Sequence, residues 1–159
     1  MWLSDSLFKQ VISSTPLISI DLIVRCSDSG RVLLGRRLNK PAKGYWFVPG
    51  GRIQKNERID VAFSRLTLEE LGLSVSINNA SFKGAYEHLY DDCVFGDEVT
   101  THYVVLGFEI FLPGSQLSSV PRFQHGAYEW FLADELLDNP QVHENTKDYF
   151  RDKAGYSLK

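Results

Sequence analysis

The chain has 159 residues, of which 43% are hydrophobic and 13% aromatic. A chain of this length buries roughly 70% of the surface that its unfolded form exposes, so we expect one folded domain over 1–159. Seventeen Lys and Arg against 20 Asp and Glu give a net charge of −3, without the basic excess that attracts a nucleic-acid backbone. The composition therefore excludes a disordered chain and argues against nucleic acid as a partner, whereas a small phosphorylated ligand needs only a few cations.

The longest apolar runs, at 17–24 and 104–108, are far shorter than the roughly 20 residues that span a membrane. Residues 1–5 lack the basic region and the cleavage site of a secretory signal. We therefore expect a cytoplasmic protein without a membrane partner. Its two cysteines, Cys26 and Cys93, are expected to be free thiols, because a core of this size does not need a disulfide.

The first part of the chain predicts a helix followed by a hairpin. Ser4 or Asp5 can cap a short N-terminal helix, whose apolar residues share one face: Leu7, Phe8, Val11 and Ile12. Residues 17–25 alternate as a strand, and Asp21 falls on its mixed face. A turn signal at 28–30 then precedes a returning strand at 32–34.

The rest of the chain predicts more strands than helices. Apolar runs typical of strands lie at 46–48, 73–77, 82–88, 100–112 and 127–131. Helices are predicted at 58–71, where Gly72 follows in the C-capping position, and at 144–153. Because the strands are too unevenly spaced for a parallel βαβ series, we predict an α+β fold with helices packed across a mixed sheet.

The predicted helix 58–71 carries an acid within its apolar stripe. At about 100° per residue, one side of this helix presents Ile59, Phe63, Leu66 and Glu70. A second apolar patch is formed by Val61, Leu68 and Leu71, so we expect the helix to be covered on more than one face and Glu70 to be partly buried. A buried carboxylate needs a cation or metal ion beside it, or it takes up a proton.

Surface acids are the alternative interpretation of Glu69 and Glu70. Glu69 lies four residues after Arg65, the spacing at which the two side chains form an ion pair on a helix surface. The helix pattern alone leaves open whether both acids are simply solvated. The residues on either side of the helix bear on the choice between solvated acids and acids of a site.

Glycine, glutamate and arginine recur at fixed spacing from Gly51 to Leu73. Five residues separate Gly51 from Glu57, seven separate Glu57 from Arg65, and the pattern ends with Glu69, Glu70 and Gly72. The segment resembles the Nudix box, a loop–helix–loop that holds divalent metal against a nucleoside diphosphate. The resemblance implies a Nudix fold, an α/β/α sandwich, and argues against a purely solvated role for the two acids.

Two positions depart from the common box. Leu66 stands where the box usually has a glutamate, and Thr67 follows where it has an aliphatic residue. An ordinary Nudix enzyme uses its helix acids to bind metal and often to activate the attacking water. Without an acid at position 66 the helix binds several metal ions less well, so we expect the base that activates water to come from another part of the chain.

These departures match one branch of the family. Residues 65–68, 40–51 and 100–108 are similar to the corresponding segments of the GDP-mannose mannosyl hydrolases, an atypical Nudix branch. The resemblance runs from about residue 14 to residue 150 and is weakest over the N-terminal dozen residues and around 113–123. It implies hydrolysis of GDP-mannose, with GDP-glucose as a further candidate, by attack of water at the anomeric carbon to release GDP and the inverted hexose.

The resemblance also implies a metal site and a set of cations. The Gly50 carbonyl, Glu70 and Gln124 match the ligands of one magnesium ion per subunit, and all three supply the oxygen donors that a hard cation prefers. Cations that neutralise charge on the departing diphosphate are matched by Arg37, Arg52 and Arg65. For each arginine, the alternative is a solvated surface charge.

Four further residues match positions that act at the sugar. His125 matches the general base, since a histidine can accept a proton from water near neutral pH. Polar positions near the sugar and the leaving group are matched by Asp21, His88 and Tyr103. Taken alone, His125 is an exposed loop histidine and Tyr103 a core tyrosine; the family context favours the site. His143 lacks a motif and is expected to be structural.

The resemblance implies a homodimer as well, which the sequence alone does not show. Two rival functions stay open at this point. One is a conventional Nudix pyrophosphohydrolase that attacks phosphorus in a nucleotide sugar. The other is a non-catalytic module that binds a nucleotide sugar, against which the intact Glu70, Gln124 and His125 argue.

Overall fold

The computed structural model describes residues 3–117 and 125–151. Its first elements are α1 (Asp5–Ser14), β1 (Leu17–Cys26), β2 (Val32–Arg37), β3 (Trp46–Phe47), β4 (Gly50–Arg52) and α2 (Ile59–Leu71). They are followed by η1 (Ile77–Asn79), β5 (Ala80–Tyr90), β6 (Thr101–Leu112), η2 (Gly114–Leu117), β7 (His125–Phe131), α3 (Ala133–Asp138), α4 (Glu144–Lys147) and η3 (Asp148–Phe150), where η denotes a 3₁₀ helix.

Strand β1 lies at the centre of the sheet. It pairs in parallel with β6 along its whole length, from Leu17 opposite Tyr103 to Cys26 opposite Leu112. The strand order is β3-β2-β1-β6-β5, with β4 paired to β1 and β7 paired to β2 off this path. All of these other pairings are antiparallel, so the sheet is mixed, as predicted.

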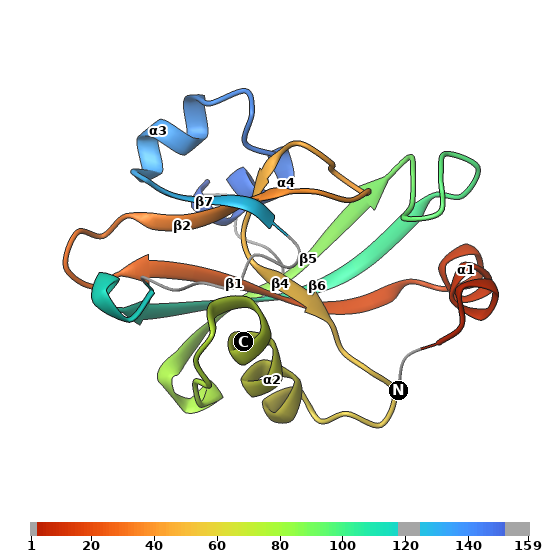
Figure 1. Ribbon diagram of the computed structural model, residues 1–159, viewed down its shortest axis with the longest axis horizontal. Coiled ribbons are helices and arrows are strands. Elements are labelled where there is room, and N and C mark those ends of the chain that lie inside the picture. Colours follow the sequence, from red (N-terminus) through yellow and green to blue (C-terminus); the bar gives the residue numbers. More distant parts are fainter. Residues whose placement is uncertain (1–2, 118–124, 152–159) are drawn as a thin grey trace.

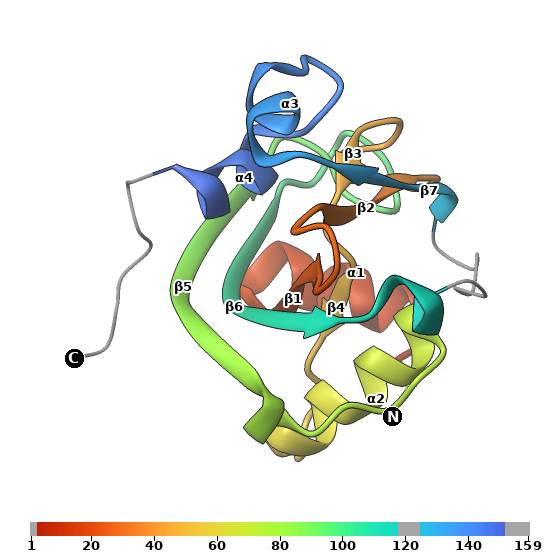
Figure 2. The same cartoon turned by 90° about the vertical axis from the view of Figure 1, so that its left-hand side faces the viewer.

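Helices cover the strands from two sides (Figures 1 and 2). Helix α2 packs against one face, where Phe63 and Leu66 join Ile20, Leu22 and other buried residues of β1 and β6 in one core cluster. Helix α3 lies on the opposite side, above a second cluster that includes Ile23, Trp46, Leu136 and Tyr149. This arrangement confirms the predicted α+β sandwich.

Helix α1 packs at the side of the sheet. Phe8, Val11 and Ile12 contact the cluster around Leu17 and Cys93, which confirms most of the predicted apolar face. Leu7, by contrast, is exposed. Cys26 and Cys93 are both free and buried, as predicted. Within 3–117 and 125–151, no helix is long and apolar enough to cross a membrane.

The predicted strand at 73–77 is wrong, because this segment hydrogen bonds to helix side chains instead of to a strand. The Val75 amide donates to Thr67 Oγ1 at 3.0 Å, and Ser64 Oγ donates to the Val75 carbonyl at 3.1 Å. Gly72 closes α2 in the left-handed conformation, with φ of 78°, as its C-capping position predicts. Thr67, at the aliphatic position of the box, therefore anchors the chain that leaves α2.

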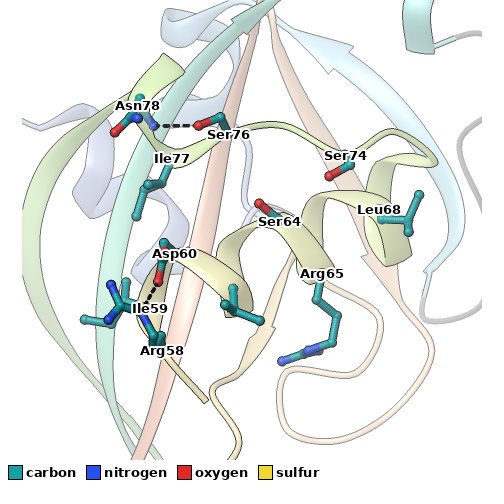
Figure 3. A pocket seen from close by; sticks show the side chains of 11 residues that line it. Arg58, Ile59, Asp60, Ser64, Arg65, Leu68, Ser74, Ser76, Ile77 and Asn78 are labelled. Carbon is teal, nitrogen blue, oxygen red and sulfur yellow. Dashed lines mark hydrogen bonds and ion pairs between the residues drawn. The ribbon is translucent and has the colours of Figure 1, made fainter.

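The predicted cover over a second face of α2 is confirmed at Leu71, which is buried, and wrong at Val61 and Leu68, which are 52% and 53% exposed. Of the predicted inner stripe, Phe63, Leu66 and Glu70 are buried, whereas Ile59 is 46% exposed. Among the elements described, α2 is the outermost layer on its side (Figure 1). Figure 3 shows the open groove on this outer side, between α2 and the chain that leads into η1.

Three smaller differences concern short elements. The predicted helix 144–153 is interrupted, since α4 ends at Lys147 and η3 covers only the next three residues. Residues 152 and 153 lie outside the described part of the chain. Helix α3 was not predicted from the sequence. The segment from Gly51 that resembles a loop–helix–loop begins in a strand, since 50–52 form β4.

One ion-pair network ties the loop before α2 to the helix. The Arg65 guanidinium forms a fork on Glu57, with Nε 2.6 Å from Oε1 and Nη2 2.9 Å from Oε2. It also donates from Nη1 to Glu69 Oε2 at 2.9 Å and from Nη2 to the Arg52 carbonyl at 3.0 Å. Arg65 thus connects β4, the loop and α2, and the predicted pair with Glu69 is confirmed.

This network makes stability depend on pH in the acid range. Arg65 holds the pKa of Glu57 below its ordinary value of 4.5, and the Glu57 side chain is only 11% exposed. A carboxylate with a lowered pKa stabilises the fold fully above the unfolded-state pKa, and this contribution is lost as the pH falls through the folded-state value. We expect Glu57→Gln to lower the free energy of unfolding by about 1–3 kcal/mol at neutral pH.

Urea unfolding of the wild type and Glu57→Gln between about pH 7 and pH 3 measures this contribution. The difference between the two proteins should shrink as the pH falls below 4.5. Asp60→Asn is a suitable control, because Asp60 pairs with Arg58 at the exposed start of the same helix. A difference for Glu57→Gln that stays constant over the whole range would contradict the assignment.

Candidate active site

Strand β4 holds the glycine pair directly against β1. Gly50 lies opposite Asp21, and Gly51 lies opposite Ile20. A Cβ atom on Gly50 would lie 2.4 Å from the Ile20 carbonyl oxygen and 2.8 Å from Asp21 Oδ1. Only glycine fits so close to the neighbouring backbone, and the Asp21 carboxylate therefore lies beside Gly50.

Leu66, at the position of the missing box acid, is a core residue. Its side chain is 2% exposed and belongs to the core cluster under α2. A Cβ atom on Gly51 would come within 2.5 Å of Leu66 Cδ2, so the leucine packs directly against the glycine backbone. An unpaired carboxylate at this position would be costly to bury. The departure from the common box is thus built into the packing between α2 and β4.

Two carboxylates, Asp21 and Glu70, are buried close to the glycine pair. Burial raises the pKa of each to about 7. The charges of Glu69 and Asp21 raise the pKa of Glu70 further, the Tyr149 hydroxyl lowers that of Asp21, and Arg37 opposes the shift in both. Glu70 is only 3% exposed, which confirms the buried acid that the helix stripe predicts. Two acids that ionise with difficulty favour a cation between or beside them.

Arg37 is the cation that faces both acids. It ends β2, and its guanidinium carbon lies 5.7 Å from the centre of the Phe47 ring. Its Nε is buried and has no hydrogen-bond partner among the described residues. A buried N–H donor without a partner is uncommon in folded proteins, and it suits an anionic group supplied by a ligand.

A tyrosine hydroxyl joins Asp21 to His88. Tyr149, in η3, donates to Asp21 Oδ2 at 2.6 Å, and its oxygen lies 3.3 Å from His88 Nε2. His88 lies on β5 opposite Tyr103 of β6. Burial lowers the pKa of His88 to about 3, so its imidazole is neutral at physiological pH. These groups form a buried polar wall beside the middle of β1, at Asp21.

A cavity of about 460 Å³ collects seven of the ten predicted site residues. They come from β1, β2, β4, α2, β5 and β6: Asp21, Arg37, Gly50, Arg52, Arg65, His88 and Tyr103. Glu70 lies close enough to Asp21 and Arg37 for their charges to shift its pKa. Segments that are distant in the sequence thus place the predicted residues around one pocket.

The remaining two predicted residues lie at the start of β7. Gln124 falls outside the described residues, and His125 is described by its backbone alone. That backbone pairs with Arg37, so His125 enters the structure beside a residue that lines the cavity. The roles of both residues stay predictions.

Several residues that line the cavity were not predicted to be part of the site. Lining residues that were not predicted include Phe8, Lys40, Tyr90 and Phe95. The Arg52 guanidinium lies over the Phe8 ring at 4.6 Å, and the Phe8 and Phe95 rings meet edge to face at 5.9 Å. His143, expected to be structural, caps α4 and contacts the rings of Phe47 and Tyr90 behind the cavity.

Two of the three predicted magnesium ligands, the Gly50 carbonyl and Glu70, lie within the described residues and supply oxygen donors, whereas Gln124 lies outside them. Within the described ranges, no three His, Cys, Asp or Glu side chains are arranged to hold a metal ion. The predicted set needs only one carboxylate, from Glu70, together with a backbone carbonyl and an amide oxygen. Its fit rests on the raised pKa of Glu70, since a cation beside the buried carboxylate would offset the cost of its charge.

Comparison with known proteins agrees with this geometry. A family model described as "NUDIX domain" matches residues 16–153. The chain is 41% identical over 113 residues to the low-salt glycan biosynthesis protein Agl8 of Haloferax volcanii, covering 71% of this chain and 70% of that protein.

Solved structures show the same fold. A MutT NUDIX hydrolase from Burkholderia pseudomallei matches with a TM-score of 0.66 at 26% identity, over 86% of this chain and 97% of that one. A MutT protein from Methanosarcina mazei Go1 matches with a TM-score of 0.67 at 20% identity, over 86% and 92% of the two chains. The Nudix fold is therefore confirmed, and the chain belongs to the Nudix hydrolase family.

Proposed function

We propose that the protein hydrolyses a GDP-linked hexose, GDP-mannose before GDP-glucose, by attack of water at the anomeric carbon in a magnesium-dependent reaction. The observation that carries this proposal is the burial of Leu66 against Gly51 at the position of the missing acid, beside a cavity lined by arginines and neutral polar groups. The relationship to a protein named for glycan biosynthesis supports a nucleotide sugar as the substrate class.

The acids of α2 favour attack at carbon over attack at phosphorus. Leu66 removes one acid, and Glu69 is held in an ion pair by Arg65. Glu70, the remaining buried acid of the helix, is the one expected to ligate the metal ion. A base from the β7 side, His125, would then act on water from a different direction, which suits an attack on the sugar.

Charge on the leaving GDP is the main electrostatic demand of this reaction. Magnesium held by the Gly50 carbonyl, Glu70 and Gln124 would supply positive charge beside the diphosphate. Arg37 offers its unpartnered Nε–H, and a guanidinium binds phosphate oxygens well. Arg52 and Arg65 line the same cavity, although Arg65 also holds Glu57 and Glu69.

The sugar is expected to lie against the buried polar wall. Asp21 can accept hydrogen bonds from sugar hydroxyls, and neutral His88 and Tyr103 can exchange them without adding charge. The homodimer, the cytoplasmic location and the single domain over 1–159 stay predictions.

The site of water attack is measured by running the reaction in oxygen-18 water. We expect the label in the free hexose and none in GDP, with the hexose released in the inverted configuration. Label in a phosphate product would instead identify the conventional pyrophosphohydrolase. Tight binding of GDP-mannose with no hydrolysis in the presence of magnesium would identify a binding module.

The role of His125 is tested by His125→Leu. General-base assistance is typically worth about 10²–10⁴-fold in rate, so kcat should fall by at least two orders of magnitude. His102→Leu is a matched control, because His102 is a partly exposed histidine outside the lining of the cavity. Activity close to wild type at neutral pH would remove His125 from the role of base.

The metal site is tested by Glu70→Gln, which keeps the shape of the side chain and removes its charge. We expect a weaker dependence of activity on magnesium and a lower kcat, because a neutral amide is a poorer ligand for a hard cation. Isothermal titration of the substrate-free protein with magnesium gives a readout that does not depend on turnover. If binding and activity both match those of the wild type, the assignment of Glu70 is wrong.

A further inference from the structure

No motif or spacing singles out Tyr149, yet this residue connects two predicted site residues. It lies in η3, at 128 positions from Asp21 and 61 from His88 along the chain. Its ring is buried and meets the Tyr86 ring edge to face at 4.6 Å. This packing fixes where the hydroxyl lies, between the carboxylate of β1 and the imidazole of β5.

The two contacts of the hydroxyl determine where the protons are. A phenol has one proton, and with Asp21 as a carboxylate, its form above the pKa of about 7, Tyr149 donates this proton to Asp21 Oδ2 at 2.6 Å. The pKa of Tyr149 is raised well above its ordinary value by burial and by Asp21, so the hydroxyl keeps this proton. Its oxygen, 3.3 Å from His88 Nε2, can then only accept a hydrogen bond from that nitrogen.

A neutral imidazole carries its single N–H on one of its two nitrogens. When Nε2 carries the proton that it donates to Tyr149, Nδ1 has a lone pair and is an acceptor. His88 lines the cavity, and the proposal requires that this acceptor face a hydroxyl group of the ligand. The contacts thus form a directed series from His88 Nε2–H, through the tyrosine oxygen, to the Asp21 carboxylate.

We propose that Tyr149 is a positioning residue of the active site, which fixes the Nε2–H tautomer of His88 and the rotamer of Asp21 so that both present acceptors to the hydroxyl groups of the sugar. This inference rests on the proposed function for the identity of the ligand. The tautomer of His88 itself is a property of the protein without substrate. Tyr149 touches neither the sugar nor the water and acts through its two partners.

The conservative change Tyr149→Phe removes the hydroxyl and keeps the ring that packs on Tyr86. Long-range proton–nitrogen NMR correlations on the substrate-free protein report which nitrogen of His88 is protonated, with the signals assigned through their loss in His88→Gln. We expect Nε2–H in the wild type and a mixture of both tautomers in Tyr149→Phe. With GDP-mannose, kcat should fall about 10- to 100-fold, as expected for misplaced site groups, while KM changes by less than about threefold.

Tyr86→Phe is the matched control, since it removes a hydroxyl from the neighbouring ring of the same cluster. It should keep the wild-type tautomer of His88 and the wild-type kcat. Wild-type His88 protonated on Nδ1 overturns the inference, as does Tyr149→Phe with an unchanged tautomer or an unchanged kcat. If Tyr149→Phe does not fold, a wild-type spectrum with the proton on Nδ1 still overturns the inference.

The two proposals can fail separately. If the wild type hydrolyses no nucleotide sugar while His88 carries its proton on Nε2 and responds to Tyr149→Phe, the proposed function fails and the positioning of His88 stands. If the wild type is active and His88 has the other tautomer, the function stands and the positioning role is wrong.

Discussion

The burial of two carboxylates near the glycine pair is the constraint on which the rest of the site depends. Asp21 and Glu70 both have a pKa raised to about 7, because burial removes the water that would stabilise their charge. Asp21 is fixed by the pairing of β1 with β4, and Glu70 by the packing of the inner face of α2. Arg37 compensates part of this cost, and its own Nε has no partner among the described residues. The raised pKa of the two acids and the buried Nε of Arg37 support the metal–diphosphate ligand of the proposed function.

Some side chains of α2 stabilise the fold, and others are left for the ligand of the proposed function. Arg65 uses its guanidinium on Glu57, Glu69 and the Arg52 carbonyl, and so stabilises the loop and the helix start. Leu66 extends the core to the backbone of Gly51. With both positions committed to structure, Glu70 is the buried acid of α2. In the proposed function it is this acid that would hold one ion, while the base comes from outside the helix.

Local patterns in the sequence predicted most of the fold and the buried acid Glu70 of α2. The strand alternation of 17–25, the capping glycine at 72 and the stripe that ends in Glu70 are each set by neighbours within a few residues, so periodicity finds them. The strand expected at 73–77 failed because the hydroxyl of Thr67 satisfies the Val75 amide, a contact between side chain and backbone that hydrophobicity does not encode. The prediction that Val61 and Leu68 are covered was wrong for a related reason, because apolar composition does not reveal that a helix is the outermost layer among the described elements.

The rest of the site depends on contacts between segments that are far apart in the sequence, and residue spacing does not predict such contacts. His88 and Tyr103 become neighbours through the register of β5 and β6, and Asp21 meets Tyr149 only because the C-terminal η3 packs behind β1. Resemblance to a family identified His88 and Tyr103, because a match to known positions does not require the contacts between strands to be derived. It gave no reason to choose Tyr149, which makes no direct contribution to a recognisable motif. A residue that acts by orienting others is defined by its hydrogen bonds, and these exist only once β1, β5 and η3 are packed together.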